Sequence, residues 1–185
     1  MNRMRSGLIG AAAVGIALLV TTPAVGSPQP AATASLTKSE SQQLQSRMAE
    51  QLRRHPGGTV VASNEISYEN GAVKVTLPLK DGAAPVPAGA TGTPNCDSGS
   101  VCLYEHDNFN GTRVSYTQCG IYNLGDRGFI DKMTSWHNNQ TGGVRAVMYD
   151  VDGNGRIYDY DQLVVGSNPN VGRSLNDRAN YIRPC

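Results

Sequence analysis

Short runs of alternating hydrophobic and polar residues fill the second half of this 185-residue chain. Val101–Tyr104 and Val114–Tyr116 are two such runs, and a polar segment rich in Asn and Gly separates them. Alternation with a period of two residues, bounded by turn-forming residues, predicts β-strands joined by tight turns. The pattern recurs at regular spacing to the end of the chain, so we predict an all-β sandwich over residues 95–185.

The two halves of this region are weakly alike. Tyr104 begins one hairpin and Tyr149 begins a matching one. A Thr-Ser-Trp sequence closes the first half, and an Ala-Asn-Tyr sequence closes the second. Two facing Greek keys would satisfy such a repeat. We expect them to bury four large side chains, those of Leu103, Phe129, Trp136 and Ile182.

Ahead of the sandwich, residues 37–58 have the pattern of an amphipathic helix. Thr37 and Glu40 have the spacing of a capping box, which marks a helix N-terminus. Apolar residues then recur at every fourth position on one face: Leu44, Met48 and Leu52. The Pro-Gly-Gly sequence at 56–58 is expected to end the helix.

A hairpin signal follows this helix. Two alternating runs, residues 65–69 and 72–77, flank Asn70-Gly71. Asn-Gly between alternating runs is a strong short-range hairpin signal. The helix-plus-hairpin segment, residues 37–77, is too small to fold convincingly alone. It either docks on the sandwich or is a removable pro-segment, and the sequence leaves both open.

The remaining segments differ in composition. Residues 1–26 combine Arg3 and Arg5 with an apolar run and a small-residue end, the layout of a secretory signal peptide. The alternative is an uncleaved membrane anchor, for which the apolar run is short. Residues 27–36 read as a flexible leader and residues 78–94 as a Pro/Ala/Gly linker. We therefore expect a secreted, extracellular protein.

Charge gives little indication of a partner. Without Arg3 and Arg5, 14 basic residues face 15 acidic ones, so the mature chain is close to neutral. Such a balance has no electrostatic footprint for nucleic acid or for an anionic membrane. We expect no nucleic-acid partner and no membrane association after signal cleavage.

Four cysteines lie in the second half of the chain: Cys96, Cys102, Cys119 and Cys185. An even number in an exported chain indicates two disulfides. A four-thiolate zinc site is the alternative, but the close Cys-x-x-Cys pairs of such sites are missing. Three pairings are possible. We favour Cys96–Cys102, which closes a tight loop, and Cys119–Cys185, which ties the chain end to the middle of the domain.

Residues 150–161 resemble a calcium-binding loop of the EF-hand type. Side-chain oxygens fall at its first, third, fifth and twelfth positions: Asp150, Asp152, Asn154 and Asp161. Two features depart from that motif, because an aspartate stands where glutamate is usual and the preceding run is predicted to be a strand. A turn rich in Asp, Asn and Gly is an equally good interpretation.

Tyr104, Phe109 and Gly111 stand at the spacing of the Greek-key signature of βγ-crystallins. Together with Cys96–Tyr104 and Asp131–Asn138, this signature resembles a family of secreted actinobacterial peptidase inhibitors of the metalloproteinase-inhibitor type. The resemblance covers residues 96–185. It implies a βγ-crystallin-like Greek-key sandwich, which the helix-plus-hairpin segment precedes.

The resemblance to crystallins also implies a calcium-binding motif. In this motif two Asn/Asp residues are followed, after two positions, by Ser/Thr and then Ser. Each half of the chain matches this motif incompletely. The matching residues are Asp131 and Thr134 in the first half, and Asn176 and Asp177 in the second. We expect at most weak binding there, so calcium is an optional ion and no cofactor is required.

The resemblance implies a peptidase inhibitor that blocks the cleft of an extracellular protease, a metalloprotease first, with a rigid loop. No motif identifies that loop. The loops considered are residues 106–110, 138–143, 153–156 and 166–172. Two alternatives remain: a calcium-binding structural or stress protein of the crystallin type, and a small secreted antimicrobial toxin. We predict no enzymatic activity, because the chain has no His-Glu-x-x-His, Gly-x-Ser-x-Gly or phosphate-loop motif.

Overall fold

The computed structural model describes residues 36–80 and 94–185, which lie within one compact unit, residues 31–185. The predicted signal peptide (1–26), almost all of the leader (27–36) and most of the linker (78–94) lie outside the described residues. In the part of the chain that the structure describes, no helix is long and apolar enough to cross a membrane.

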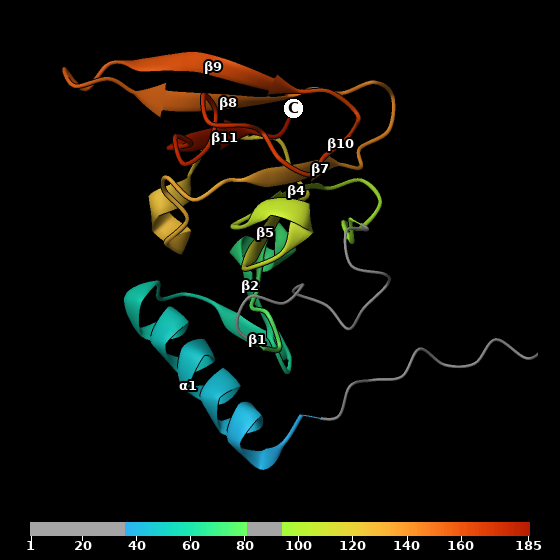
Figure 1. The fold of residues 1–185 in the computed structure, drawn as a ribbon, viewed down its shortest axis with the longest axis vertical. Coiled ribbons are helices and arrows are strands. Elements are labelled where there is room, and N and C mark those ends of the chain that lie inside the picture. Colours follow the sequence, from blue (N-terminus) through green and yellow to red (C-terminus); the bar gives the residue numbers. More distant parts are fainter. Residues whose placement is uncertain (1–35, 81–93) are drawn as a thin grey trace, which may run out of the picture. The chain divides into compact units, whose positions relative to one another are not determined.

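Two antiparallel sheets make up the sandwich (Figure 1). One contains strands in the order β5-β4-β7-β10, and the other in the order β6-β11-β8-β9. The bounds are β4 (Val101–Tyr104), β5 (Arg113–Tyr116), β6 (Tyr122–Asn123), β7 (Ser135–Asn138), β8 (Ala146–Val151), β9 (Ile157–Leu163), β10 (Gly166–Asn168) and β11 (Tyr181–Arg183). Each half of the repeat gives three strands to one sheet and one strand to the other, which is the predicted pair of Greek keys.

Reciprocal hydrogen bonds join the two halves. The Asp131 amide donates to the Ala179 carbonyl at 3.0 Å, and the Asp177 amide donates to the Met133 carbonyl at 3.2 Å. Both aspartates have a left-handed backbone, with φ of 51° and 52°. The symmetry of these contacts confirms the weak internal repeat seen in the sequence.

The core lies between the two sheets. All four side chains predicted to be buried are buried: Leu103, Phe129, Trp136 and Ile182. The described residues therefore confirm the predicted all-β, βγ-crystallin-like Greek-key sandwich.

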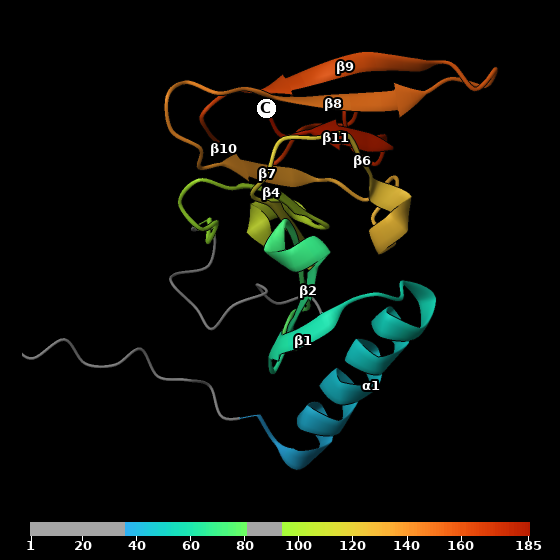
Figure 2. The same cartoon turned by 180° about the vertical axis from the view of Figure 1, so that it is seen from behind.

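The segment before the sandwich packs against the same core. Helix α1 (Lys38–Arg54) begins at the predicted capping box of Thr37 and Glu40 and buries Leu44 and Met48. It lies beside the hairpin in both views (Figures 1 and 2). The hairpin strands are β2 (Glu65–Tyr68) and β3 (Val73–Thr76), and an unpredicted outer strand, β1 (Thr59–Ala62), pairs with β2.

Strand β3 continues the first sheet by pairing with β5, with Val73 opposite Tyr116 and Val75 opposite Val114. The complete sheet therefore has seven strands, in the order β1-β2-β3-β5-β4-β7-β10. Of the two possibilities left by the sequence, docking of the segment is what the structure shows.

Two disulfides close the fold, and both have the favoured pairing. Cys96 is joined to Cys102 with a Cα–Cα distance of 5.7 Å, and Cys119 is joined to Cys185 with a distance of 5.1 Å. The second bond ties the chain terminus to the connection between β5 and β6.

Candidate functional site

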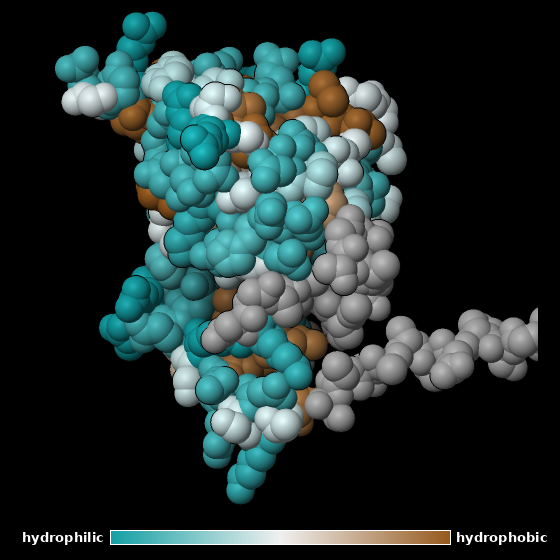
Figure 3. Space-filling model, viewed as in Figure 1, coloured by the Kyte–Doolittle hydropathy of each residue, from teal (hydrophilic) through white to brown (hydrophobic). Residues whose placement is uncertain are grey.

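The connection between β5 and β6, residues 117–122, exposes an isoleucine to solvent. Ile121 is 70% exposed, more than any other large hydrophobic side chain among the described residues. The face drawn in Figure 3 is mostly hydrophilic with small hydrophobic patches, as expected of a protein surface. An isoleucine that is 70% exposed on a short loop is a candidate contact for a partner.

Four contacts at three points hold the 117–122 loop in place. At its start, the Thr117 amide donates to the Ala72 carbonyl at 3.0 Å, and the Thr117 hydroxyl donates to the Gly71 carbonyl at 3.1 Å. In its middle, Cys119 is covalently bound to the chain terminus. At its end, the Tyr122 hydroxyl donates to the Gln118 carbonyl at 3.3 Å. The backbone around Ile121 is thus preorganised.

Two tyrosines form the base of the loop. The rings of Tyr122 and Tyr116 lie 5.0 Å apart, and Tyr116 is buried. A Cβ atom on Gly120 would lie only 3.3 Å from the Tyr122 ring, so the ring packs directly on the glycine backbone. Burial, followed by the nearby charge of Glu69, raises the pKa of Tyr122. The base of the loop is therefore uncharged at neutral pH.

The turn that holds Thr117 is itself anchored. Glu69 forms an ion pair with Arg127, whose guanidinium lies 4.3 Å from the centre of the Tyr68 ring. Glu69 and Asn70 both have positive φ, at 50° and 53°, which lets the chain turn tightly from β2 into β3. The carbonyls of Gly71 and Ala72 are thereby directed at Thr117.

A second exposed hydrophobic site lies between β9 and β10. Val164 and Val165 are each 47% exposed. Asn138, which is buried, donates from its side chain to the Leu163 carbonyl at 2.7 Å, and its backbone pairs with Gly166. One buried asparagine therefore fixes both ends of this loop. It is the alternative candidate.

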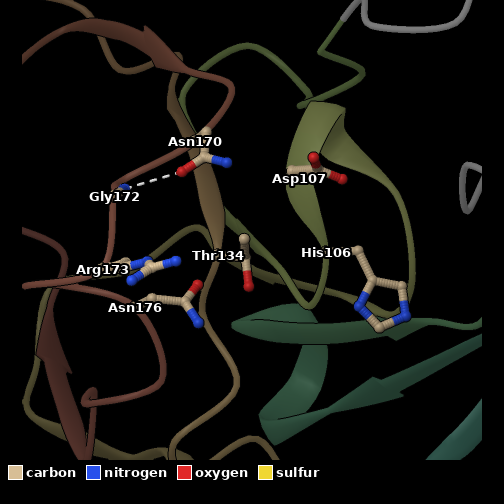
Figure 4. Close-up of a pocket in the computed structure, with 7 residues that line it drawn as sticks. All are labelled: His106, Asp107, Thr134, Asn170, Gly172, Arg173 and Asn176. Atoms are coloured by element: carbon tan, nitrogen blue, oxygen red, sulfur yellow. Dashed lines mark hydrogen bonds between the residues drawn. The ribbon is translucent and has the colours of Figure 1, made fainter.

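Two of the loops considered from the sequence, 106–110 and 166–172, border a polar hollow of about 490 Å³ (Figure 4). The Asn108 amide donates to the Pro169 carbonyl at 2.8 Å and so joins the two loops. The hollow is lined by His106, Asp107, Thr134, Asn170, Gly172, Arg173 and Asn176. Its lining side chains carry imidazole, carboxylate, hydroxyl, amide and guanidinium groups.

The structure does not gather the EF-hand-type residues into a metal site. Asp150 accepts hydrogen bonds from the Tyr158 hydroxyl at 2.8 Å and from Arg178 at 2.9 Å. Burial raises the pKa of Asp150, but these hydrogen bonds, one from the Val151 amide and the charge of Arg178 together keep the pKa below its usual value. Asp161 lies in β9, where its side chain accepts from the Gln162 amide. The described residues contain no group of three His, Cys, Asp or Glu side chains able to hold a metal.

The remaining residues of that motif form the tip of the β8–β9 hairpin. Asp152 accepts from the amides of Asn154 and Arg156, both at 2.9 Å. An aspartate that bonds to backbone amides two and four residues later stabilises a tight turn. The structure shows this turn, and calcium binding at the loop stays a prediction.

The residues of the crystallin-type calcium motif form hydrogen bonds with other groups of the protein. Asp131 accepts from the Asn180 side chain at 3.1 Å, and the Thr134 hydroxyl donates to the Glu105 carbonyl at 2.9 Å. The Asn176 side chain donates to Asp177 at 2.6 Å. Burial, followed by the charges of Asp150 and Asp177, raises the pKa of Asp131.

Sequence reasoning missed the loop at 117–122. Its signal was present as Cys119-Gly120-Ile121, an apolar residue between a turn glycine and a tyrosine, close to a paired cysteine. The same pattern is equally typical of a buried strand, because the exposure of the Ile121 side chain depends on the direction that the chain takes after Gly120.

Residues 89–160 match the model of peptidase inhibitor family I36. Among solved structures, the chain is similar to a βγ-crystallin domain from Clostridium beijerinckii, with 28% identity over 45% of this chain and 94% of that one and a TM-score of 0.35. It is also similar to spherulin 3A from Physarum polycephalum, with 25% identity over 49% of this chain and 86% of that one and a TM-score of 0.32. No curated protein matches the chain. The family match, together with the Greek-key architecture seen here, supports a peptidase inhibitor family with the βγ-crystallin fold.

Proposed function

We propose that this chain is a secreted inhibitor that blocks the cleft of an extracellular metalloprotease with the 117–122 loop. The family match supports peptidase inhibition. The observation that carries the choice of loop is the exposure of Ile121 on a backbone fixed at three points. The metalloprotease target rests on the resemblance of the sequence to inhibitors of that type.

A fixed loop is suited to inhibition because it loses little conformational entropy on binding. Each side chain that is ordered only in a complex weakens binding by about 0.5–1.5 kcal/mol. Burial of an isoleucine side chain in an apolar pocket stabilises a complex by about 1.5–3 kcal/mol. A protease with a hydrophobic specificity pocket is therefore the expected partner. The inhibitor itself performs no chemistry in this mechanism and needs no ion of its own.

The direct test is a titration of the secreted, disulfide-bonded protein against a panel of purified zinc and serine proteases. We expect stoichiometric, competitive loss of activity for at least one zinc protease. Excess zinc must leave the inhibition unchanged, which separates binding from removal of the metal. If no protease of the panel slows at micromolar inhibitor, the proposal fails, and a structural protein of the crystallin type becomes the better account.

Secretion is part of the proposal and rests on the composition of residues 1–26. Intact mass of the exported protein tests it. We expect a chain that begins at Ser27, whereas a mass that includes Arg3 would contradict cleavage.

A further inference from the structure

We infer that the helix-plus-hairpin segment, residues 37–77, positions the 117–122 loop, and that inhibition by this loop therefore depends on the segment. This inference rests on the proposed function, which assigns the loop its role. Under this inference residues 37–77 are part of the inhibitory site. The alternatives are that they are a spacer, or a pro-segment that inhibition does not need.

The segment is an addition to the Greek keys. Strands β5 and β9 are the corresponding outer strands of the two halves of the repeat. In the described residues β9 remains the outer strand of its sheet, whereas β5 is covered by β3. The sandwich topology thus does not require a strand on this edge. The covered edge is the one that leads directly into the loop, because Thr117 follows the last residue of β5.

The attachment of the segment is buried and specific. Ile66, Tyr68, Val73 and Val75 are each no more than 2% exposed. The side chain of Arg113, in β5, donates to the Thr76 hydroxyl at 3.0 Å and lies 3.4 Å from the Glu65 carboxylate. The same guanidinium donates to the backbone carbonyl and the side chain of Asn95. One buried charge is therefore shared between the segment and the sandwich.

The contact with the loop comes from the turn between β2 and β3. Both polar groups of Thr117 that can donate, its amide and its hydroxyl, bind carbonyls of this turn, those of Ala72 and Gly71. Without the segment, Thr117 loses both partners, and the first anchor of the loop after β5 is then Cys119. A loop freed at one end must be ordered again when it enters a protease cleft, which weakens binding.

Full-length point variants test this inference without disturbing the core. Thr117→Val removes the hydroxyl donor and keeps the side-chain shape. Glu69→Gln weakens the ion pair that anchors the turn. Arg53→Gln is the matched control, because Arg53 also lies in the segment but forms its ion pair with Glu50 within the exposed face of α1. We expect the first two substitutions to raise the inhibition constant about three- to tenfold, and the control to change it less than twofold.

Hydrogen exchange of the Thr117 amide provides a readout that needs no protease. We expect protection in the wild type that drops at least tenfold in Glu69→Gln and stays unchanged in Arg53→Gln. If the wild type inhibits no protease, the proposed function fails, while a protected amide that responds to Glu69→Gln still supports the positioning role. An unprotected amide overturns the inference, whatever the inhibition data show.

Cleavage of the chain supplies the second measurement. A specific protease site introduced in residues 81–93 allows the covalent link between the segment and the sandwich to be cut in the folded protein. We expect the nicked protein to remain a two-chain complex on size exclusion, with an inhibition constant within twofold of the uncut protein. Dissociation of the segment with inhibition unchanged would overturn the inference, because the loop would then be competent alone.

Discussion

At the scale of single residues, polar side chains at two places hold elements that are distant in the sequence. Arg113 connects β5 to the hairpin strands through Thr76 and Glu65. Asn138 connects the end of β7 to the β9–β10 loop. A buried polar group is favourable only when its partners are present. These residues therefore specify which segments come together, as well as contributing to stability.

Histidine protonation should make the fold less stable in mild acid. Burial lowers the pKa of His137, and burial followed by the charge of Arg127 lowers that of His55. The unfolded state then binds more protons than the folded state once the pH falls below about 7. The folded state therefore keeps its full stability above the pKa that these histidines have in the unfolded chain. It loses stability as the pH falls from there through their lower pKa in the folded protein.

This prediction is measured as the melting temperature between pH 8 and pH 5. We expect a decline towards pH 5 that becomes shallower in His137→Asn. His106 has an exposed side chain and supplies the control variant, His106→Asn. An equal slope in wild type and His137→Asn would contradict the assignment.

At the scale of elements, the sequence predicted those features whose signals are local. The capping box of α1, the hairpin at Asn70-Gly71 and most strands of the sandwich are confirmed, because each depends on a pattern within about ten residues. Pairing of β3 with β5 joins residues about 40 positions apart, and no local pattern encodes it. Strand β1 was missed because its adjacent valines, Val60 and Val61, do not alternate with polar residues.

The candidate site was predicted less well than the fold. The spacing of oxygens from Asp150 to Asp161 suits a calcium loop, but the same spacing suits a hairpin turn stabilised by Asp152. Of the two partners of Asp150, Tyr158 lies opposite it in the same hairpin, whereas Arg178 lies outside the loop, and no local pattern encodes that second contact. The exposure of Ile121 likewise depends on the direction of the chain after β5.

The β8–β9 hairpin gives a prediction about calcium. Asp152→Ala removes the acceptor for two amides of the turn and should lower the free energy of unfolding by about 1 kcal/mol. We expect the same loss with and without millimolar calcium, measured by urea unfolding. Asp159→Ala, on the exposed side of the same hairpin, should have little effect. A calcium-dependent rise in wild-type stability that Asp152→Ala abolishes would instead support an ion site there.

At the scale of the whole molecule, one side of the sandwich carries the hairpin, the Cys119–Cys185 bond and the 117–122 loop. The segment covers the β5 edge, and the disulfide fastens the chain terminus to the loop that follows β5. The stability of the fold and the rigidity of the loop are therefore linked. The Cys96–Cys102 bond, in contrast, joins the chain before β4 to the second residue of that strand.

The two disulfides should consequently differ in their effects. Replacement of Cys119 and Cys185 by serine opens a loop with a sequence separation of 66 residues, and chain entropy predicts a loss of about 4 kcal/mol. Replacement of Cys96 and Cys102 should lower stability by about 2 kcal/mol. We expect only the first pair of substitutions to weaken inhibition, measured under conditions where both variants are folded. Equal effects on the inhibition constant would argue against the 117–122 loop.

The central claim is that Ile121 enters the protease cleft, and the inhibition constants of two matched full-length variants test it most directly. Ile121→Ser and Val165→Ser each replace an exposed aliphatic side chain, one in each candidate loop. Loss of about 1.5–3 kcal/mol of apolar burial predicts that Ile121→Ser raises the inhibition constant at least tenfold. Val165→Ser should change it less than twofold. The opposite ranking would assign inhibition to the β9–β10 loop and contradict this account.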